Sequence, residues 1–359
     1  MVDYEEMWQL PPYSLNAEEK RVFLSAHLKR LTEHHYQQCA EYRRIVDGLG
    51  IPLEEDYYSL PFIPVRLFKE YELLSVDRSE IVKTMTSSGT TGQQVSKIFL
   101  DRETSSHQTK VLTKIVSSFL GNSRLPMVIL DTPAVIKNRA MFSARGAGIL
   151  GFQMFGRDRI FALDENMELD IDGLEEFLEK HRDEPVFLFG FTFMVWQHFV
   201  EKLLDAGYRP DLTKGVLIHG GGWKKLADRK ISSNEFRAAL HRVCGIKRVH
   251  DYYGMVEQTG TIYMECECGH LHTSIFSDVI IRNPFDFSVC TERESGLVEA
   301  VSILPYSYPG HIILTEDEGV LLGEDTCPCG RKGKYFRITG RIKNAEIRGC
   351  SDTYADGFR

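Results

Sequence analysis

The sequence lacks any long hydrophobic run, and none of its apolar stretches approaches the roughly 20 residues that a helix needs to span a bilayer. It also lacks a secretory signal peptide, because its first residues, MVDYEEMWQLPPYS, are acidic and carry no apolar stretch after a basic start. An excess of positive charge is missing as well, since the formal net charge is −8. These absences predict a cytoplasmic protein without stable membrane insertion, and they give no electrostatic reason to expect nucleic acid as a partner.

The N-terminal part is predicted to form one long helix over residues 16–48, followed by a connector with several prolines. Asn16 can cap this helix, with Glu19 at the spacing of a capping box, and Gly48 and Gly50 can end it. Its apolar stripe consists of Val22, Leu24, Leu28 and Leu31.

From about residue 80 onward, short apolar runs alternate with helical stretches, which is typical of an α/β domain with a largely parallel sheet. The expected strands are 127–130, 186–189 and 216–218, and the expected helices are 105–120 and 192–204. Beyond residue 275 the pattern changes to short β-type runs broken by Gly and Pro, which predicts a smaller β region. Its expected strands are 278–281, 297–303 and 311–314.

A loop of alternating hydroxyl residues and glycines at residues 87–92 suits a polyphosphate. Glycines let backbone N–H groups approach the phosphates, Ser and Thr hydroxyls add donors, and a lysine shortly after adds a point charge. The candidate residues are Ser87, Ser88, Gly89, Thr90, Thr91, Gly92 and Lys97. A flexible surface loop is the alternative for an isolated run of this kind.

Three better-known motifs are excluded. Gln93 and Gln94 follow Gly92 where a Walker A loop requires Lys and Ser or Thr. Residues 146–151 match GxGxxG, but no apolar strand precedes them, so a tight turn or close packing is the expected role. The run from His219 to Gly222 resembles a hydrolase oxyanion loop, yet the chain contains no GxSxG motif.

The cysteines are expected to be thiols or metal ligands, because the chain shows no secretory signal. Four of them form two C-x-C-G pairs, Cys266 with Cys268 and Cys327 with Cys329. Four thiolates in two close pairs predict a closed, structural Zn²⁺ site, with His270 and His272 near enough in sequence to substitute as ligands. Four unrelated buried cysteines are the alternative.

Five motifs in chain order resemble those of the adenylate-forming superfamily, which contains acyl- and aryl-CoA ligases, firefly luciferase and peptide-synthetase adenylation domains. They are TSSGTTGQ at 86–93, HGGGW at 219–223, DYYGMVEQTG at 251–260, LTEDEG at 314–319 and ITGRIKNAEIRG at 338–349. Within the superfamily the chain is most similar to the LuxE-type acyl-protein synthetases (luciferin-component ligases), with the phenylacetate-CoA ligases as more distant relatives. This resemblance implies an α/β fold like the superfamily's N-terminal domain, with parallel-rich sheets and helices plus a smaller β region. Because the sequence stops just after the hinge motif, we expect the mobile C-terminal domain to be absent or truncated.

The resemblance also implies how the nucleotide is bound. Gly221 and Gly222 belong to the adenine-side loop, and Tyr253 and Gly254 to the motif whose tyrosine stacks on adenine. Asp317 corresponds to the carboxylate at a strand end that holds the ribose. The cofactor is therefore expected to be ATP.

Two charged residues have implied catalytic roles. Glu257 corresponds to the ligand of the Mg²⁺ that neutralises charge on the phosphates, although Val256 stands where the superfamily usually has Thr or Ser. Arg341 corresponds to the hinge arginine that contacts ribose or phosphate. Lys343 is not assigned the superfamily's catalytic lysine role, because that lysine belongs to the C-terminal domain.

Cys350 is the expected acyl acceptor, since the LuxE-type enzymes use a cysteine close to the C-terminus. A thiolate can attack an acyl-adenylate, release AMP and hold the acyl group as a thioester, and Arg348 can lower its pKa. The implied partners are a fatty-acid substrate, for whose tail the apolar stretch 187–196 is suitable, and an acyl-accepting protein such as a reductase or carrier. The oligomeric state is not predicted.

The sequence therefore predicts three parts: an N-terminal helix and connector at 1–79, an adenylate-forming core with an inserted zinc site at 80–340, and a hinge motif with the acceptor-cysteine tail at 341–359. The predicted activity is ATP-dependent activation of a long-chain fatty acid, with transfer to a cysteine and then to a partner. Two alternatives remain: a CoA or carrier-protein ligase similar to the phenylacetate enzymes, and an inactive nucleotide-binding scaffold.

Overall fold

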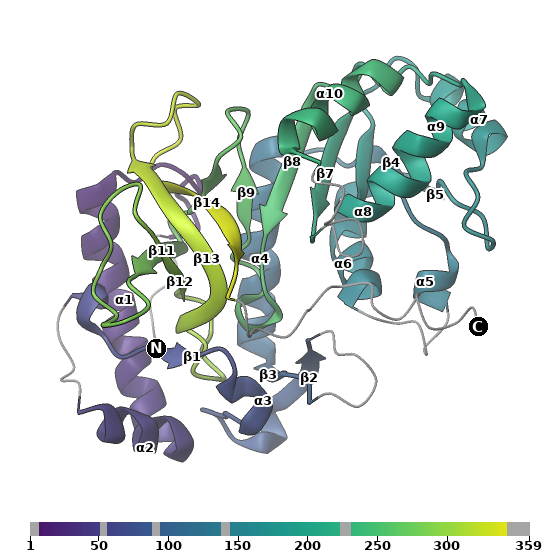
Figure 1. Ribbon diagram of the computed structural model, residues 1–359. Coiled ribbons are helices and arrows are strands. Elements are labelled where there is room, and N and C mark those ends of the chain that lie inside the picture. The colour runs from purple at the N-terminus through teal and green to yellow at the C-terminus, as the bar shows by residue number, and fades with distance from the viewer. Residues whose placement is uncertain (1–6, 51–55, 88–93, 138–143, 223–230, 343–359) are drawn as a thin grey trace. The chain divides into compact units, whose positions relative to one another are not determined.

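The computed structural model describes residues 7–50, 56–87, 94–137, 144–222 and 231–342 (Figure 1). These residues divide into two compact units. Unit 1 combines the chain up to Ser118 with the chain from Gly254 onward, and unit 2 comprises Phe119–Tyr253. This division differs from the expected boundaries at 79 and 340, because the N-terminal segment folds together with the later β region. Among the described residues, no helix is long and apolar enough to cross a membrane.

Unit 2 contains a parallel sheet in the order β5-β4-β6-β7-β8. Its strands are β4 Leu125–Ile129, β5 Gly156–Phe161, β6 Phe187–Phe191, β7 Val216–Gly220 and β8 Arg248–Tyr253. Its helices are α5 Ala134–Lys137, α6 Ala144–Phe152, α7 Ile171–Lys180, α8 Thr192–Met194, a π-helix Val195–Val200, α9 Glu201–Ala206 and α10 Ser233–Cys244, with a 3-10 turn Gln153–Phe155. The parallel α/β prediction is confirmed, and the helix expected at 192–204 is present but contains the π-helical turn.

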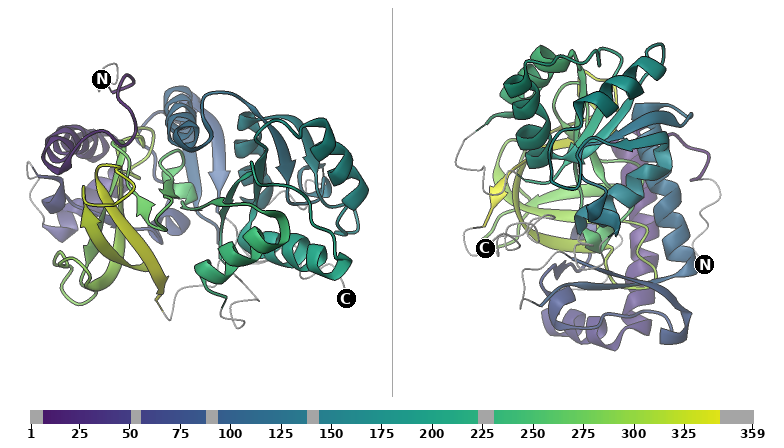
Figure 2. Two further views of the ribbon diagram at one scale, coloured as in Figure 1. Left: turned by 90° about the horizontal axis from the view of Figure 1, so that it is seen from above. Right: turned by 90° about the vertical axis from the view of Figure 1, so that its right-hand side faces the viewer.

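The sheet of unit 2 is buried on both faces, which explains why its strands are almost continuously apolar. Leu188 of β6 belongs to one core cluster with Phe177 of α7 and Leu240 of α10. On the opposite face, Phe189 stacks on Phe152 of α6 with ring centroids 4.2 Å apart. Helices therefore cover both faces of this sheet (Figure 2). The side chains of β6 fill the core, so the expected use of this stretch for a substrate tail has no support in the fold.

Unit 1 contains an antiparallel sheet in the order β11-β12-β13-β14-β10-β9, and β1 pairs in parallel with β13. The strands are β1 Ile63–Pro64, β9 Tyr263–Glu265, β10 Leu271–His272, β11 Ser277–Arg282, β12 Ser295–Ser302, β13 Ile312–Glu324 and β14 Lys334–Arg341. A separate hairpin joins β2 Ile81–Thr86 to β3 Lys97–Asp101. The expected β region is confirmed, but β13 is much longer than the predicted strand 311–314.

The helices of unit 1 include two where the sequence predicted one. They are α1 Ala17–Gln38, α2 Ala40–Leu49, α3 Leu67–Glu70 and α4 Arg102–Leu120, with 3-10 turns at Tyr57–Ser59, Arg78–Glu80 and Val256–Gln258. The capping box of Asn16 and Glu19 is present at the start of α1, and Gly50 ends α2 in the left-handed conformation.

The single helix expected over 16–48 is wrong, because Cys39 adopts an extended conformation and separates α1 from α2. This break lets Cys39, Tyr42 and Val46 pack together in a second core cluster. Val22, which was expected in the apolar stripe, is 69% exposed. Tertiary packing has therefore overridden the local helical pattern.

A buried group of charges connects α1 to the sheet of unit 1. Nζ of Lys334 lies 2.7 Å and Nζ of Lys20 lies 3.2 Å from the carboxylate of Asp278, and the Tyr57 hydroxyl donates to the same carboxylate. Burial alone would raise the pKa of Asp278, but the two ammonium groups lower it to about 2. Asp278 is therefore ionised and compensated inside the protein.

Candidate active site and candidate metal centre

The base of the predicted phosphate loop is a closed hairpin turn in unit 1. The backbone N–H of Ser87 donates to the carbonyl of Ser96 at 3.1 Å, and the N–H of Ser96 donates to Oγ of Ser87 at 2.9 Å. Lys97 begins β3 directly opposite Thr86, and its ammonium group lies 3.9 Å from the carboxylate of Glu72. The loop is therefore held between two paired strands. Ser88, Gly89, Thr90, Thr91 and Gly92 lie outside the described residues.

The glycines of the HGGG run lie at the carboxyl end of β7 in unit 2. Gly221 has φ +80°, a conformation that side-chain-bearing residues rarely adopt. A Cβ atom on Gly220 would lie 2.4 Å from the ring of Tyr252, which pairs with it from β8. Gly222 is exposed and a Cβ there would meet nothing within 4 Å. Two consecutive glycines are thus required by conformation and close packing, and ligands of parallel sheets bind at these strand ends.

Polar side chains gather at the same strand ends, and the sequence alone did not place them in the candidate site. Oγ1 of Thr192 shares a 2.9 Å hydrogen bond with Nδ1 of His219 and donates to the carbonyl of Gly220 at 3.2 Å. Burial, together with the charge of Arg237, lowers the pKa of His219 to about 3, so its ring is neutral at pH 7. Thr192 follows a buried strand, which was the one signal that the sequence offered for it.

Close packing also accounts for the GxGxxG match at residues 146–151. A Cβ atom on Gly148 of α6 would lie 3.0 Å from the ring of Phe191 at the end of β6. The expected role in close packing is confirmed for this glycine.

The motif at 251–260 is divided between the two units. Tyr253 ends β8 in unit 2, and Gly254 begins the part of unit 1 that contains Glu257. Glu257 lies in the 3-10 turn Val256–Gln258 and is 3% exposed. Its backbone carbonyl accepts a 2.9 Å hydrogen bond from the Tyr308 hydroxyl, which fixes the turn. The side chain of Val256 packs against the core cluster of α2 and β13. Because this side chain is apolar, it offers no oxygen ligand to a metal ion.

Asp317 and Arg341 form an ion pair in unit 1. Nε of Arg341 donates a 2.9 Å hydrogen bond to Oδ1 of Asp317, and the two residues are register partners of β13 and β14. Both side chains remain partly accessible, with 16% of Asp317 and 32% of Arg341 exposed. The expectation that Asp317 ends a strand is wrong, because β13 continues to Glu324. The structure nevertheless brings together two predicted site residues from separate motifs.

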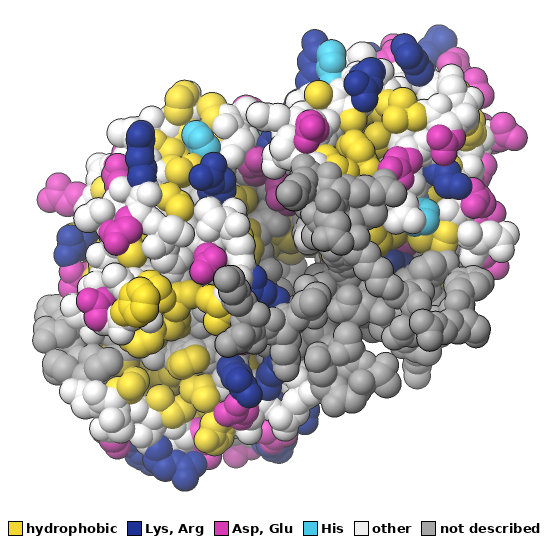
Figure 3. Space-filling model, in the orientation of Figure 1, with side chains coloured by type: hydrophobic (Ala, Val, Ile, Leu, Met, Phe, Trp, Pro, Cys, Tyr) yellow, Lys and Arg dark blue, Asp and Glu magenta, His cyan; other side chains and the backbone are white. Residues whose placement is uncertain are grey.

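The remaining predicted site residue, Cys350, lies outside the described residues, as does Lys343. Among the described residues on the face shown in Figure 3, Lys and Arg side chains are interspersed with Asp and Glu.

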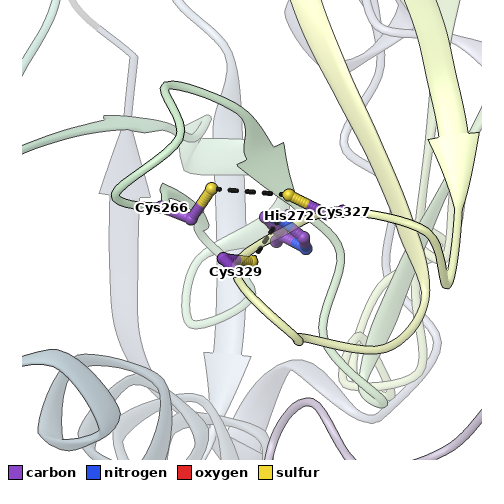
Figure 4. A group of neighbouring side chains, drawn as sticks. All are labelled: Cys266, His272, Cys327 and Cys329. Atoms are coloured by element: carbon purple, nitrogen blue, oxygen red, sulfur yellow. Dashed lines mark hydrogen bonds between the residues drawn. The ribbon is translucent and has the colours of Figure 1, made fainter.

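The two C-x-C-G pairs come together with one histidine in unit 1. Cys266, Cys327, Cys329 and His272 each offer a ligand atom, and these atoms lie within 4.8 Å of one another. Their side chains point toward a common centre (Figure 4). Three of the four predicted cysteine ligands are therefore neighbours. The fourth, Cys268, is exposed and does not belong to the group.

Comparison with known proteins identifies the family of this chain. A model of the LuxE family, described as acyl-protein synthetase, matches residues 5–359. The long-chain-fatty-acid–luciferin-component ligase of Vibrio harveyi is 22% identical over 360 residues, which cover 97% of this chain and 91% of that protein.

Solved structures identify the fold. 2-Hydroxyisobutyryl-CoA ligase, in an open conformation with 2-HIB-AMP and CoA, has a TM-score of 0.70 at 14% identity and covers 93% of this chain and 72% of its own. The same ligase in its thioesterification state has a TM-score of 0.69 at 16% identity, with 94% and 71% covered. The chain thus has the α/β fold of adenylate-forming ligases. With the family model matching almost every residue, this chain is a ligase and belongs to the LuxE acyl-protein synthetase family.

Proposed function

We propose that the protein uses ATP to activate a long-chain fatty acid as acyl-AMP, holds the acyl group on Cys350 and transfers it to a partner protein. The observation that supports this proposal most is the Asp317–Arg341 pair, because it joins the predicted ribose carboxylate to the hinge arginine. The N–H of Arg341 orients the carboxylate of Asp317. A carboxylate can accept hydrogen bonds from two ribose hydroxyls, which is the role proposed for Asp317.

The phosphate groups would be bound at the β2–β3 hairpin. The paired residues Ser87 and Ser96 fix both ends of its loop. The Ser, Thr and Gly residues at 88–92 would supply the hydroxyl and backbone N–H donors for anionic oxygens. Lys97 begins the strand that follows the loop, and its ammonium group lies 3.9 Å from the carboxylate of Glu72, with both side chains about half exposed. An exposed pair at this distance contributes little, so a phosphate can replace the glutamate.

In unit 2, the adenine would be bound by the glycines after β7 and by Tyr253. The ring of Tyr252 packs against Gly220, and the next two residues, Gly221 and Gly222, are exposed. A flat aromatic purine fits such a surface by stacking. The resemblance assigns the stacking on adenine to Tyr253, which ends β8.

Glu257 is the residue that would hold Mg²⁺. Its carboxylate is a hard oxygen ligand, and Mg²⁺ usually binds one or two carboxylates together with the phosphates of its substrate. When bound, the ion would neutralise charge on the phosphates. Val256 cannot contribute a ligand, so water would have to complete the coordination.

The chemistry then follows in two steps. A carboxylate oxygen of the fatty acid attacks the α-phosphorus of ATP, and the bond to pyrophosphate breaks, which gives acyl-AMP. The Cys350 thiol loses its proton to solvent and its sulfur attacks the acyl carbonyl, which releases AMP and leaves a thioester. The fatty acid and the partner-protein transfer rest on the family and on the name of the Vibrio harveyi relative.

The proposal is tested by incubating the protein with ATP, Mg²⁺ and a radiolabelled long-chain fatty acid. We expect label on the chain that hydroxylamine removes, because thioesters react with it. Cys350→Ala should carry no such label. Cys268→Ala is the matched control, because Cys268 is an exposed thiol without an assigned acyl role, and it should label fully.

Each other outcome has a definite meaning. Label on neither the chain nor CoA, together with no ATP–pyrophosphate exchange with any acid tested, contradicts the activation step. Equal labelling of wild type and Cys350→Ala contradicts the thioester step alone. Acyl-CoA formation at full rate by Cys350→Ala, after CoA is added, would instead identify a CoA ligase.

A further inference from the structure

Two turns of the same kind face each other in unit 1, one in each C-x-C-G pair. In the first turn the N–H of Gly269 donates to the carbonyl of Cys266 at 2.9 Å, and in the second the N–H of Gly330 donates to the carbonyl of Cys327 at 3.0 Å. Both glycines are left-handed, with φ +80° and +82°. In the first turn the N–H of Cys268 also donates to Sγ of Cys266 at 3.4 Å.

We infer that Cys266, His272, Cys327 and Cys329 bind one structural Zn²⁺ ion in a Cys₃His site. A tetrahedral zinc with Zn–S bonds of about 2.3 Å and a Zn–N bond of about 2.0 Å separates two sulfurs by about 3.8 Å, and a sulfur from the nitrogen by about 3.5 Å. Sγ of Cys266 lies 3.8 Å from Sγ of Cys327, and Sγ of Cys329 lies 3.4 Å from Nε2 of His272. Both measured edges agree with the tetrahedron.

The same distances argue against a disulfide. The sulfurs of Cys266 and Cys327 are separated by 3.8 Å, whereas a disulfide bond is about 2.05 Å long. Three sulfurs and an imidazole nitrogen converging without a covalent bond are the donor set that zinc prefers among common metals.

His272, and not Cys268, is the fourth ligand because the backbone directs the two side chains differently. The first turn exposes Cys268 to solvent, while the two-residue strand β10 places His272 inside the protein with no exposed surface. The second turn differs, because both Cys327 and Cys329 point to the centre (Figure 4). The two sequence repeats are therefore alike in backbone but contribute unequal numbers of ligands.

The residues around the site hold the ligands in place. The ring of His272 stacks near Tyr335 at 5.7 Å and meets Tyr13 edge-on at 6.1 Å, which restricts its rotation. Nδ1 of His270 lies 3.3 Å from Sγ of Cys327, where it can donate to a metal-bound thiolate. Arg331 pairs with both oxygens of Glu267, at 2.6 and 3.2 Å, and so connects the two turns a second time. Such outer contacts orient metal ligands.

The ion would join the β9–β10 hairpin to the connection between β13 and β14. Cys266 directly follows β9 and His272 ends β10, whereas Cys327 and Cys329 lie in the connection between β13 and β14. β10 pairs with β14 through only two register positions. With four protein ligands the ion has no open position, so its role is structural and independent of the proposed ATP chemistry.

The test is metal analysis of the full-length protein purified without chelators. We expect about one zinc per chain in the wild type and in Cys268→Ser, as a tetrahedral Cys₃His site requires. Cys266→Ser, Cys327→Ser, Cys329→Ser and His272→Ala should each lose the ion. His270→Ala should retain it with affinity weakened about 10- to 100-fold, as for other outer-shell changes.

A measurement on the wild-type protein tests the same ligand set without requiring that the variants fold. X-ray absorption should show three sulfurs at about 2.3 Å and one nitrogen at about 2.0 Å around the zinc. Four sulfurs, or loss of zinc from Cys268→Ser equal to that from Cys266→Ser, would overturn the Cys₃His assignment in favour of four cysteines. Wild-type protein that contains no zinc and binds none when it is added would overturn the site itself.

Discussion

Nε of Arg341 donates a 2.9 Å hydrogen bond to Oδ1 of Asp317 from the register position directly opposite on the neighbouring strand. The two residues come from motifs that the sequence could place in order but could not bring into contact. Because both side chains remain partly exposed, a ligand can reach the pair without any rearrangement of the surrounding core.

Asp317→Ala should therefore raise the KM for ATP in pyrophosphate exchange about 10- to 100-fold, the loss expected for hydrogen bonds to a charged acceptor. Arg341→Lys should impair binding as well, because a lysine cannot reproduce the oriented N–H of a guanidinium. Glu318→Gln is the control, since consecutive strand residues point to opposite faces. An unchanged KM for ATP in Asp317→Ala, together with a lower melting temperature, would show that the pair is only structural.

The three glycines after His219 should respond differently to alanine. Gly221→Ala should cost roughly 1–2 kcal/mol of stability, because it places a Cβ in the left-handed conformation. Gly220→Ala should displace the ring of Tyr252 and weaken ATP binding, whereas Gly222→Ala should be tolerated in the free protein. Urea unfolding and the KM for ATP measure the two effects. Equal destabilisation by Gly222→Ala and Gly221→Ala would contradict the account.

Glu257→Gln should raise the Mg²⁺ concentration needed for half-maximal pyrophosphate exchange while leaving the fold intact. The turn is held by the backbone carbonyl of Glu257 and the Tyr308 hydroxyl, so the amide does not disturb it. Val256→Thr should lower the Mg²⁺ requirement by supplying a hydroxyl, at some cost in stability because Val256 packs against apolar side chains. A Mg²⁺ dependence identical to wild type in Glu257→Gln would remove this residue from the metal site.

The buried charges of unit 1 should make stability depend on pH. The pKa of Asp278 is about 2 in the folded protein, below the value of about 3.9 for an unfolded chain. Its stabilising contribution is therefore complete above about pH 4 and is lost as the pH falls toward about 2.

Asp278→Asn should destabilise the protein by about 3–5 kcal/mol at pH 7, because Lys20 and Lys334 would remain buried without their counter-ion. It should also flatten the dependence of stability on pH between about 2 and 4, as measured by urea unfolding. A loss below 1 kcal/mol, or an unchanged acid profile, would contradict the compensation assigned to Asp278.

Much of unit 2 could be predicted from sequence, because strands buried on both faces must be apolar throughout and the helices between them must cover the sheet. The capping box of Asn16 was equally local and was also predicted. The break at Cys39 was not, since nothing within the helical pattern shows that Tyr42 and Val46 must turn toward a distant core cluster.

The candidate sites show the same limit. The C-x-C-G repeats predicted two turns and a metal centre, but whether Cys268 or His272 points inward depends on how β10 pairs with β14. The length of β13 likewise depends on its partners, so Asp317 was expected at a strand end and lies within the strand instead. The ligand set and the length of β13 are both determined by pairing between strands that lie far apart in the sequence, and the local sequence gives no information on that pairing.

The central claim is the formation of an acyl-adenylate, and ATP–pyrophosphate exchange measures it most directly. With Mg²⁺ and a panel of acids from short aryl to long-chain fatty acids, we predict exchange that is fastest with a long-chain fatty acid and strongly reduced in Asp317→Ala. Exchange should be unchanged in Cys350→Ala, because the thioester forms after pyrophosphate has left. If folded wild-type protein catalyses no exchange with any acid of the panel, the account is contradicted.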